Sequence, residues 1–283
     1  MVLESLTNPY NAEKHPWEMF FIGLVYSSVA IFLSLQIFES MAGMISVFIT
    51  VMASIPIMYS TIKFEEKKDL SGLKEVFLLK EHSRALMLFT FLFLGVMVAY
   101  TLWYIFLPVE SVHNLFSIQI ETIRNINSNV VGYSSSMYSS FLKIFTNNVK
   151  VLMFCILFAF FYGAGAIFIL TWNASVIAVA IGTFFRNNIS SYAHAAGLHK
   201  LGGYFHIFSI SFLRYMVHGL PEILAYFVGG LAGGIISVAV IKHDFRSKNF
   251  EKILLDAADL ILIAFALLVV GGLIEVYITP SLF

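Results

Sequence analysis

Apolar and polar positions alternate along the chain in long blocks. The first three apolar blocks are Trp17–Phe38, Met41–Ile62 and Ala85–Leu107. A helix needs about 20 apolar residues to cross the hydrocarbon core of a bilayer, and each block is long enough to do so. The pattern therefore predicts three membrane-spanning helices in the first part of the chain.

The apolar pattern resumes after a long polar stretch. Val151–Thr171 and Ala174–Phe185 are apolar blocks separated by the dipeptide Trp172-Asn173, and they predict spans four and five with a tight turn between them. Leu260–Thr279 is another block of spanning length and predicts span seven.

The block His206–Ile241 is too long for a single crossing. As one helix it would extend about 54 Å at about 1.5 Å per residue. Proline cannot donate a backbone hydrogen bond inside a helix, so Gly219 and Pro221 predict a break. We expect a re-entrant half-helix over His206–Val217 and span six over Pro221–Ile241. The predicted fold class is an all-α polytopic membrane protein with about seven spans and this half-helix.

Basic residues predict the orientation of these spans, because cytoplasmic loops carry most of the Lys and Arg. The loop Lys63–Arg84 holds six of them and Lys242–Lys252 holds four, whereas the longer stretch Pro108–Thr146 holds two. The N-terminus is therefore expected in the cytoplasm and the C-terminus outside the cell membrane. The first apolar block is too long for the core of a cleavable signal peptide.

Two polar segments lie between the early spans. Lys63–Lys80 alternates acidic and basic residues and is predicted to be a solvated cytoplasmic connector helix. Ser111–Ser140 is predicted to be an amphipathic helix on the outer membrane surface; its apolar stripe comprises Leu115, Ile118, Ile123 and Ile126. The sequence thus divides into an N-terminal membrane region, residues 1–146, and a membrane core, residues 147–283.

Composition supports the membrane assignment. Of 283 residues, 59% are hydrophobic and 12% are charged, too few to cover the core of a water-soluble domain. The net charge of zero lacks the basic excess that attracts nucleic acid. Cys155 is the single cysteine, which excludes an intrachain disulfide. The lipid bilayer is the expected surrounding of this chain.

Three ionisable residues fall within or beside the later predicted spans, where an unpaired charge costs at least a few kcal/mol. Glu222 follows Pro221, His218 precedes Glu222 by four residues, and Glu275 lies four residues before the end of span seven. Glu222 and Glu275 should lie at similar depth, near the outer ends of their helices. These residues are candidates for function.

Other polar residues are expected on the same side, and structural roles remain open for several. Glu222 would lie at a helix N-terminus, with Arg214 or Arg186 as its ion-pair partner. His218 would cap the interrupted backbone, and Asn147 would be a helix N-cap. Glu275 has no basic neighbour in the sequence, so it needs a partner from elsewhere, a proton or water. The predicted polar cluster comprises His218, Glu222, Glu275, Arg214, Asn147 and Asn148.

A metal site is an alternative interpretation of the same residues. His218, Glu222 and Glu275 offer imidazole and carboxylate groups suited to a divalent ion. Further donors would come from His206, His199 or His194. Pro221 lies between His218 and Glu222, so this pair does not have the regular helical spacing of known two-histidine zinc motifs.

Glycines form two overlapping small-xxx-small pairs in span six. Gly229 pairs with Gly233, and Gly230 pairs with Gly234. Such pairs allow helices to approach closely. Packing within one chain is the simpler interpretation, and a homodimer seam is the alternative.

Several motifs together resemble the stage II sporulation protein M family. They are the run from His218 to Ala225 with its HG-x-x-E pattern, the glycines that follow, the Asn147-Asn148 pair, Asn173 and the closing segment Ile274–Pro280. The similarity covers roughly residues 147–280. It implies an integral membrane protein that, in endospore formers, belongs with cell-wall-degrading partners.

Three classes of function follow. An integral membrane scaffold or assembly protein is favoured, with other membrane or envelope proteins as partners. The first alternative is an ion or small-solute transporter using a broken helix with Glu222 and Glu275. The second is the His/Glu metal site, since no other cofactor is predicted. Because the chain has no G-x-S-x-G, P-loop or Rossmann motif, a non-enzymatic role is favoured.

Overall fold

The computed structural model describes residues 14–38, 41–69, 75–131, 137–162, 165–189, 197–242 and 248–282. Nearly all of these residues are helical, as the sequence predicts. The helices are α3 (Glu18–Ile37), α4 (Ala42–Asp69), α5 (Glu75–Phe106), α6 (Val109–Val131), α7 (Met137–Tyr162), α8 (Ala166–Asn188), α9 (Gly197–Lys242), α10 (Lys248–Leu273), the π-helix η3 (Ile274–Ile278) and α11 (Thr279–Leu282).

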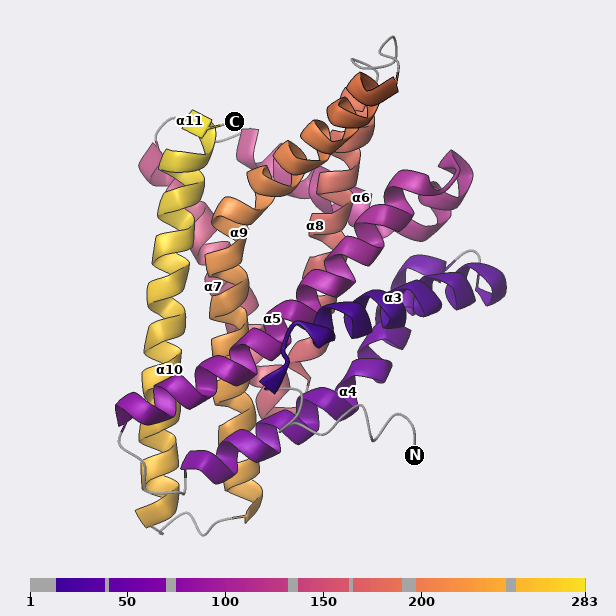
Figure 1. Ribbon diagram of the computed structural model, residues 1–283. Helices are drawn as coiled ribbons and strands as arrows, with labels where there is room; N and C mark the ends of the chain where they lie inside the picture. Colours follow the sequence, from indigo (N-terminus) through magenta and orange to yellow (C-terminus); the bar gives the residue numbers. More distant parts are fainter. Residues whose placement is uncertain are drawn as a thin grey trace.

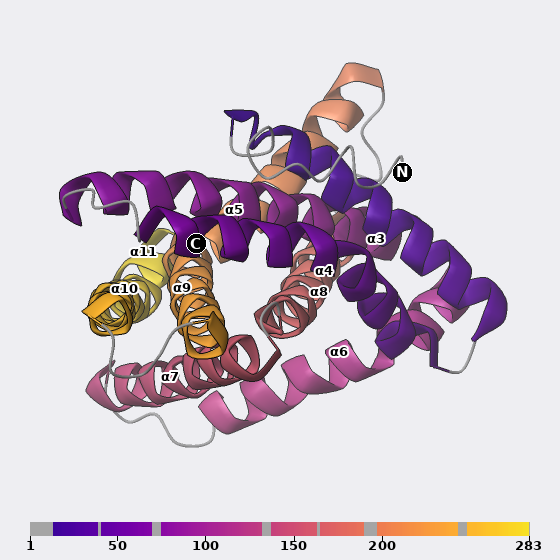
Figure 2. The same cartoon turned by 90° about the horizontal axis from the view of Figure 1, so that it is seen from below.

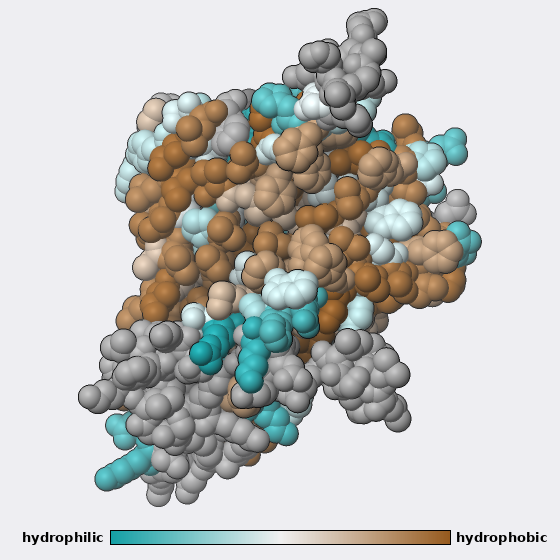
Figure 3. Space-filling view, in the orientation of Figure 1, coloured by the Kyte–Doolittle hydropathy of each residue, from teal (hydrophilic) through white to brown (hydrophobic). Residues whose placement is uncertain are grey.

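Within these described ranges, seven helical stretches are long and apolar enough to cross a membrane, which confirms the predicted number. Helices α9 and α10 run alongside each other over much of their length, whereas α3, α4 and α5 cross the bundle obliquely (Figure 1). Seen from below, α4 and α5 lie along one side and α6 and α7 along the other, with α8 between them (Figure 2). The face that carries α3, α5 and α10 is predominantly hydrophobic (Figure 3).

The break between spans four and five lies earlier than predicted. Helix α7 ends at Tyr162 and α8 begins at Ala166, so Trp172 and Asn173 lie inside α8. The Asn173 side chain donates to the carbonyl oxygen of Ile169, 2.8 Å away and one turn earlier. The predicted turn is therefore wrong, because an asparagine that bonds to its own helix does not interrupt it.

The predicted half-helix is also wrong. Helix α9 is continuous over 46 residues and contains Pro221 in its interior. At about 1.5 Å per residue it is about 69 Å long, more than twice the thickness of a hydrocarbon core. Its first half leans away from its second half (Figure 1). The proline therefore accompanies a change of direction in this helix and does not end it.

The two polar segments differ from their predicted forms. Residues 63–69 continue α4 and residues 75–80 begin α5, so the separate connector helix is wrong. The amphipathic segment does form α6, but this helix packs against α4 and α8. Leu115, Phe116 and Gln119 are buried on α6, whereas Ile118 is exposed. The buried face of α6 is thus only partly the predicted stripe.

Candidate functional site

The candidate site lies where α7, α9 and the end of α10 meet. His218 and Glu222 are one turn apart on α9, on either side of the proline. Pro221 has no N–H, so the carbonyl of Val217 loses its usual partner within the helix. Neighbouring helices and polar side chains commonly compensate for such a loss within membranes. The polar residues nearest to Pro221 on α9 are His218 and Glu222.

Glu222 is held by a side chain from α7. The Asn148 amide nitrogen donates to Glu222 Oε1 at 2.5 Å, and Asn148 is only 7% exposed. Asn148 lies well inside α7, which begins at Met137, so this asparagine ties two helices together. Asn147 also lies inside α7 and is exposed to the surroundings, so the predicted N-cap at this position is wrong.

Glu275 meets Glu222 from the other side. The two carboxyl groups lie close enough to interact directly. Glu275 lies in η3, where the helix widens to i→i+5 bonding for five residues. Such π-helical turns are rare and occur frequently at functional sites. The structure thus brings together the two carboxyl groups that the sequence places at similar depth.

His218 contacts a different side chain. Its Nδ1 lies 3.2 Å from the Thr279 hydroxyl, and that hydroxyl donates to the carbonyl oxygen of Ile274 at 3.2 Å. The backbone N–H of Thr279 bonds to the same carbonyl. His218 therefore links α9 to the end of the π-helical turn.

Glycine makes room for the carboxyl pair. A Cβ atom placed on Gly271 would lie 2.8 Å from Glu222 Cγ, closer than real Cβ contacts. Gly271 thus allows α10 to approach α9 at the level of Glu222.

The predicted arginine partners lie elsewhere. The guanidinium of Arg214 lies over the Phe184 ring, 5.3 Å from its centre. Arg186 donates to the carbonyl oxygens of Ile105 and Leu107 at the end of α5. Neither arginine forms an ion pair with Glu222 in the described part of the chain, so that structural interpretation of Glu222 is wrong.

The sequence did not predict the burial of Tyr226 or the buried pair formed by Glu65 and His82. Tyr226 lies one turn beyond Glu222, is 4% exposed and lies near the carboxyl pair; its i+4 spacing from Glu222 was the available signal.

Glu65 and His82 form a buried pair between α4 and α5, with Oε2 and Nδ1 2.6 Å apart. Both belong to the predicted cytoplasmic loop Lys63–Arg84, which is why their burial and pairing were not predicted.

The geometry does not support the metal interpretation. Among the described residues, no three His, Cys, Asp or Glu side chains are grouped so that they could hold a metal ion. His206 is exposed on α9, and the side chains of His194 and His199 lie outside those that the structure describes.

The glycines of α9 are used within the chain. A Cβ on Gly233 would lie 2.5 Å from the carbonyl oxygen of Ile156, and one on Gly229 would lie 2.3 Å from Leu152 Cδ1, both on α7. A Cβ on Gly230 would lie 2.9 Å from the Cβ of Ala166 on α8. Gly234 is also buried. These contacts give no support to a homodimer seam along the glycines.

Comparison with known proteins identifies the family. No curated protein and no solved structure matches the chain. The family model described as Stage II sporulation protein M matches residues 85–280, well over half of the chain. The match includes α5 from residue 85 onward and all of α6, so it begins before the predicted domain division at residue 146, which itself stays a prediction. The chain therefore belongs to the stage II sporulation protein M family of multi-pass membrane proteins.

Proposed function

We propose that this protein is an integral membrane scaffold that assembles other membrane or envelope proteins. One observation supports this role most directly. The polar groups of the candidate site are paired with one another: Asn148 and Glu275 hold Glu222, and Thr279 holds His218. A substrate site keeps a few polar groups directed at its ligand, whereas these groups join α7, α9, η3 and α11.

The lining of the described pockets supports the same role. One pocket lies between α3 and α5 and another between α5, α8 and α9, and both are lined mainly by apolar side chains. Transport sites in membrane proteins are formed by polar side chains or by unwound backbone. Neither pocket has that character.

Photocrosslinking in native membranes tests the scaffold role. A photoreactive amino acid would replace one exposed residue at a time, at Phe205 of α9 or Phe161 of α7, which are 74% and 69% exposed. Phe227, which is 2% exposed, is the buried control. We expect a protein adduct of reproducible mass from one exposed face and none from the control. Lipid adducts alone at every exposed position would contradict the proposal.

A second candidate is transport of protons or cations. The specific observation in its favour is a carboxyl pair between a proline-containing helix and a π-helical turn, both within membrane spans. Ionisable residues within spans often mark ion pathways.

Proteoliposomes distinguish the two candidates. Under the scaffold proposal, purified protein with the wild-type sequence shows no ion flux above that of protein-free liposomes. A flux that Glu222→Gln abolishes and Asn147→Ala preserves would favour transport instead. The predicted orientation, with the N-terminus in the cytoplasm, stays a prediction in either case.

A further inference from the structure

The α3–α5 pair contains a crevice that the candidate site does not use. These two helices touch closely at one level. A Cβ on Gly23 would lie 2.3 Å from the carbonyl oxygen of Leu92, and a Cβ on Gly95 would lie 1.9 Å from that of Phe20. Glycine at both positions therefore lets the backbones meet.

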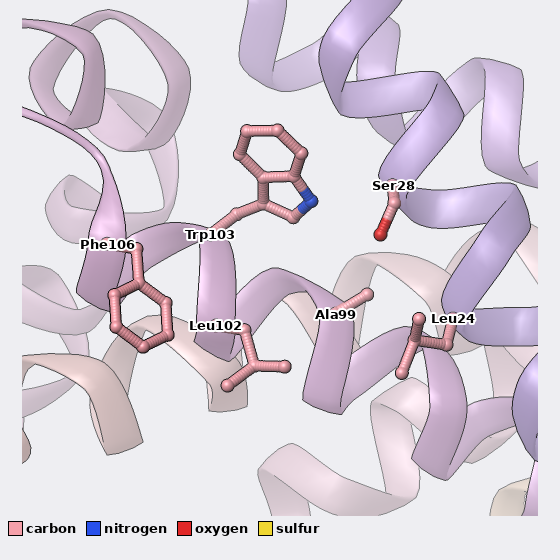
Figure 4. A pocket seen from close by; sticks show the side chains of 6 residues that line it. All are labelled: Leu24, Ser28, Ala99, Leu102, Trp103 and Phe106. Atoms are coloured by element: carbon pink, nitrogen blue, oxygen red, sulfur yellow. The ribbon is translucent and has the colours of Figure 1, made fainter.

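Beyond this contact the helices separate, because α3 and α5 cross at an angle (Figure 1). The space between them is a pocket of about 250 Å³. The lining consists of two residues of α3 and four of α5, namely Leu24, Ser28, Ala99, Leu102, Trp103 and Phe106 (Figure 4). The crevice is thus a consequence of the glycine contact and of the helix directions.

The crevice opens toward the lipid. Val25 and Val29 beside it on α3 are 53% and 50% exposed, and Phe106 at its end is 79% exposed. All three belong to helices long and apolar enough to cross a membrane. In that setting, the material available to fill the crevice is hydrocarbon.

The size of the crevice selects the occupant. An apolar cavity of about 150 Å³ is large enough to bind benzene, so about 250 Å³ accepts a longer hydrocarbon segment. A helix from a partner has a diameter of about 10–12 Å with its side chains and needs a wider groove. A flexible alkyl chain fits the crevice and a helix does not.

Two polar groups give the crevice a preferred ligand chemistry. Ser28 Oγ and Trp103 Nε1 are the polar side-chain atoms of its lining, and the two groups face each other across it (Figure 4). In the part of the chain that the structure describes, neither forms a hydrogen bond to a protein group. An unpaired donor in hydrocarbon is costly, so a ligand oxygen beside an alkyl chain would be stabilised here.

We propose that the crevice binds one acyl chain of a bilayer glycerolipid, with the Trp103 N–H donating to the ester carbonyl oxygen. Trp103 lies three residues before the end of α5, where tryptophan commonly meets the polar boundary of the membrane. The alkyl chain extends from there past Ser28 toward the Gly23–Gly95 contact. This inference is independent of the scaffold role.

Native mass spectrometry of the protein, purified in detergent and supplied with a diacyl phosphatidylethanolamine, tests the proposal. Ser28→Phe fills the crevice, and Val29→Phe adds the same ring to the exposed side of α3. We expect one retained lipid per chain in the wild-type protein and in Val29→Phe, and none in Ser28→Phe. Equal retention in both variants, or no retention in the wild-type protein, would overturn the proposal.

A second comparison does not depend on Ser28→Phe folding. Trp103→Phe keeps the ring and removes the N–H, so retention of the ester lipid should weaken about fivefold, the factor expected for one hydrogen bond. An ether-linked analogue lacks the ester carbonyl and should bind the wild-type protein and Trp103→Phe equally. If Trp103→Phe weakens both lipids alike, the proposed hydrogen bond is wrong. An adduct with the mass of a second chain would also contradict the proposal.

Discussion

The α3–α5 contact and the α7–α9–α10 contact are both closed by glycine, yet only the second encloses ionisable side chains. Gly23 and Gly95 bring two backbones together beside an apolar crevice. Gly233 brings α9 onto α7, and Gly271 brings α10 onto Glu222. The same small residue therefore serves tight apolar packing in one region and a polar cluster in the other.

The two regions also differ in how buried polar groups find partners. In α3 and α5, Ser34 and Thr101 each donate to a carbonyl oxygen three or four residues earlier in the same helix. In the second region, Asn148 bonds to a residue 74 positions away and His218 to one 61 positions away. The hydroxyls of Ser34 and Thr101 are satisfied wherever their own helices form, whereas the polar cluster requires the assembled bundle.

The strongest test of this comparison is Gly95→Ala. Its Cβ would overlap the carbonyl oxygen of Phe20, a backbone atom that cannot move without separating α3 from α5. We expect a loss of about 3 kcal/mol or more, the upper range for overpacking, and a melting temperature lower by about 6–12 °C. Thermal unfolding of the purified protein in detergent measures this change in melting temperature.

Gly202→Ala is the matched control, because nothing lies within 4 Å of the added methyl group. It should leave the melting temperature unchanged or raise it slightly, since alanine favours helix over glycine. Equal effects of the two substitutions would show that the α3–α5 contact is not as close as described.

The second test addresses the polar region. Asn148→Ala removes the donor to Glu222 and should cost about 2 kcal/mol, as for hydrogen bonds to charged groups, which lowers the melting temperature by about 4–8 °C. Asn147→Ala, one residue earlier and exposed, should change stability by about 0.5 kcal/mol or less. A similar loss in both variants would argue that the asparagines act through helix propensity and not through Glu222.

The number and type of spans were predictable because both depend on local run length and composition. Their ends were not. Asn173 is of a type common in turns, yet α7 ends at Tyr162 and α8 begins at Ala166, so Asn173 lies inside a helix. Pro221 costs about 3 kcal/mol in a helix interior, but α9 stays helical because it is the most enclosed of the seven spans and a broken backbone in lipid costs more.

The candidate site was predictable in its members and not in its contacts. Depth along the membrane follows from position in a span, so Glu222 and Glu275 could be placed at one level. The identity of neighbouring helices depends on the whole bundle and cannot be derived from local sequence. Arg214 and Arg186 were therefore assigned to Glu222, whereas Arg214 contacts Phe184 and Arg186 bonds to the end of α5. Asn148 was selected, but its partner could not be known before α7 was placed beside α9.

A third test concerns the carboxyl pair. Glu275→Gln keeps a donor toward Glu222, so the free energy of unfolding should change by less than about 1 kcal/mol. Glu275→Leu removes that partner and should cost about 1–2 kcal/mol, because Glu222 keeps only the Asn148 bond. If Gln is as damaging as Leu, a hydrogen bond between the side chains at positions 222 and 275 does not contribute to stability.

The smallest expected effect lies at the end of the π-helical turn, and it separates the roles of His218 and Glu222. Thr279→Val keeps the shape of the side chain and removes the hydroxyl that contacts His218 and the Ile274 carbonyl. The loss should be about 1 kcal/mol, or about 2–4 °C in melting temperature, and Thr279→Ser should restore most of it. Combining Thr279→Val with Asn148→Ala shows whether the two contacts act together. Losses that add within about 0.5 kcal/mol would mean that two independent bonds hold α9, whereas a clear departure from additivity would make His218, Glu222 and their partners one coupled network.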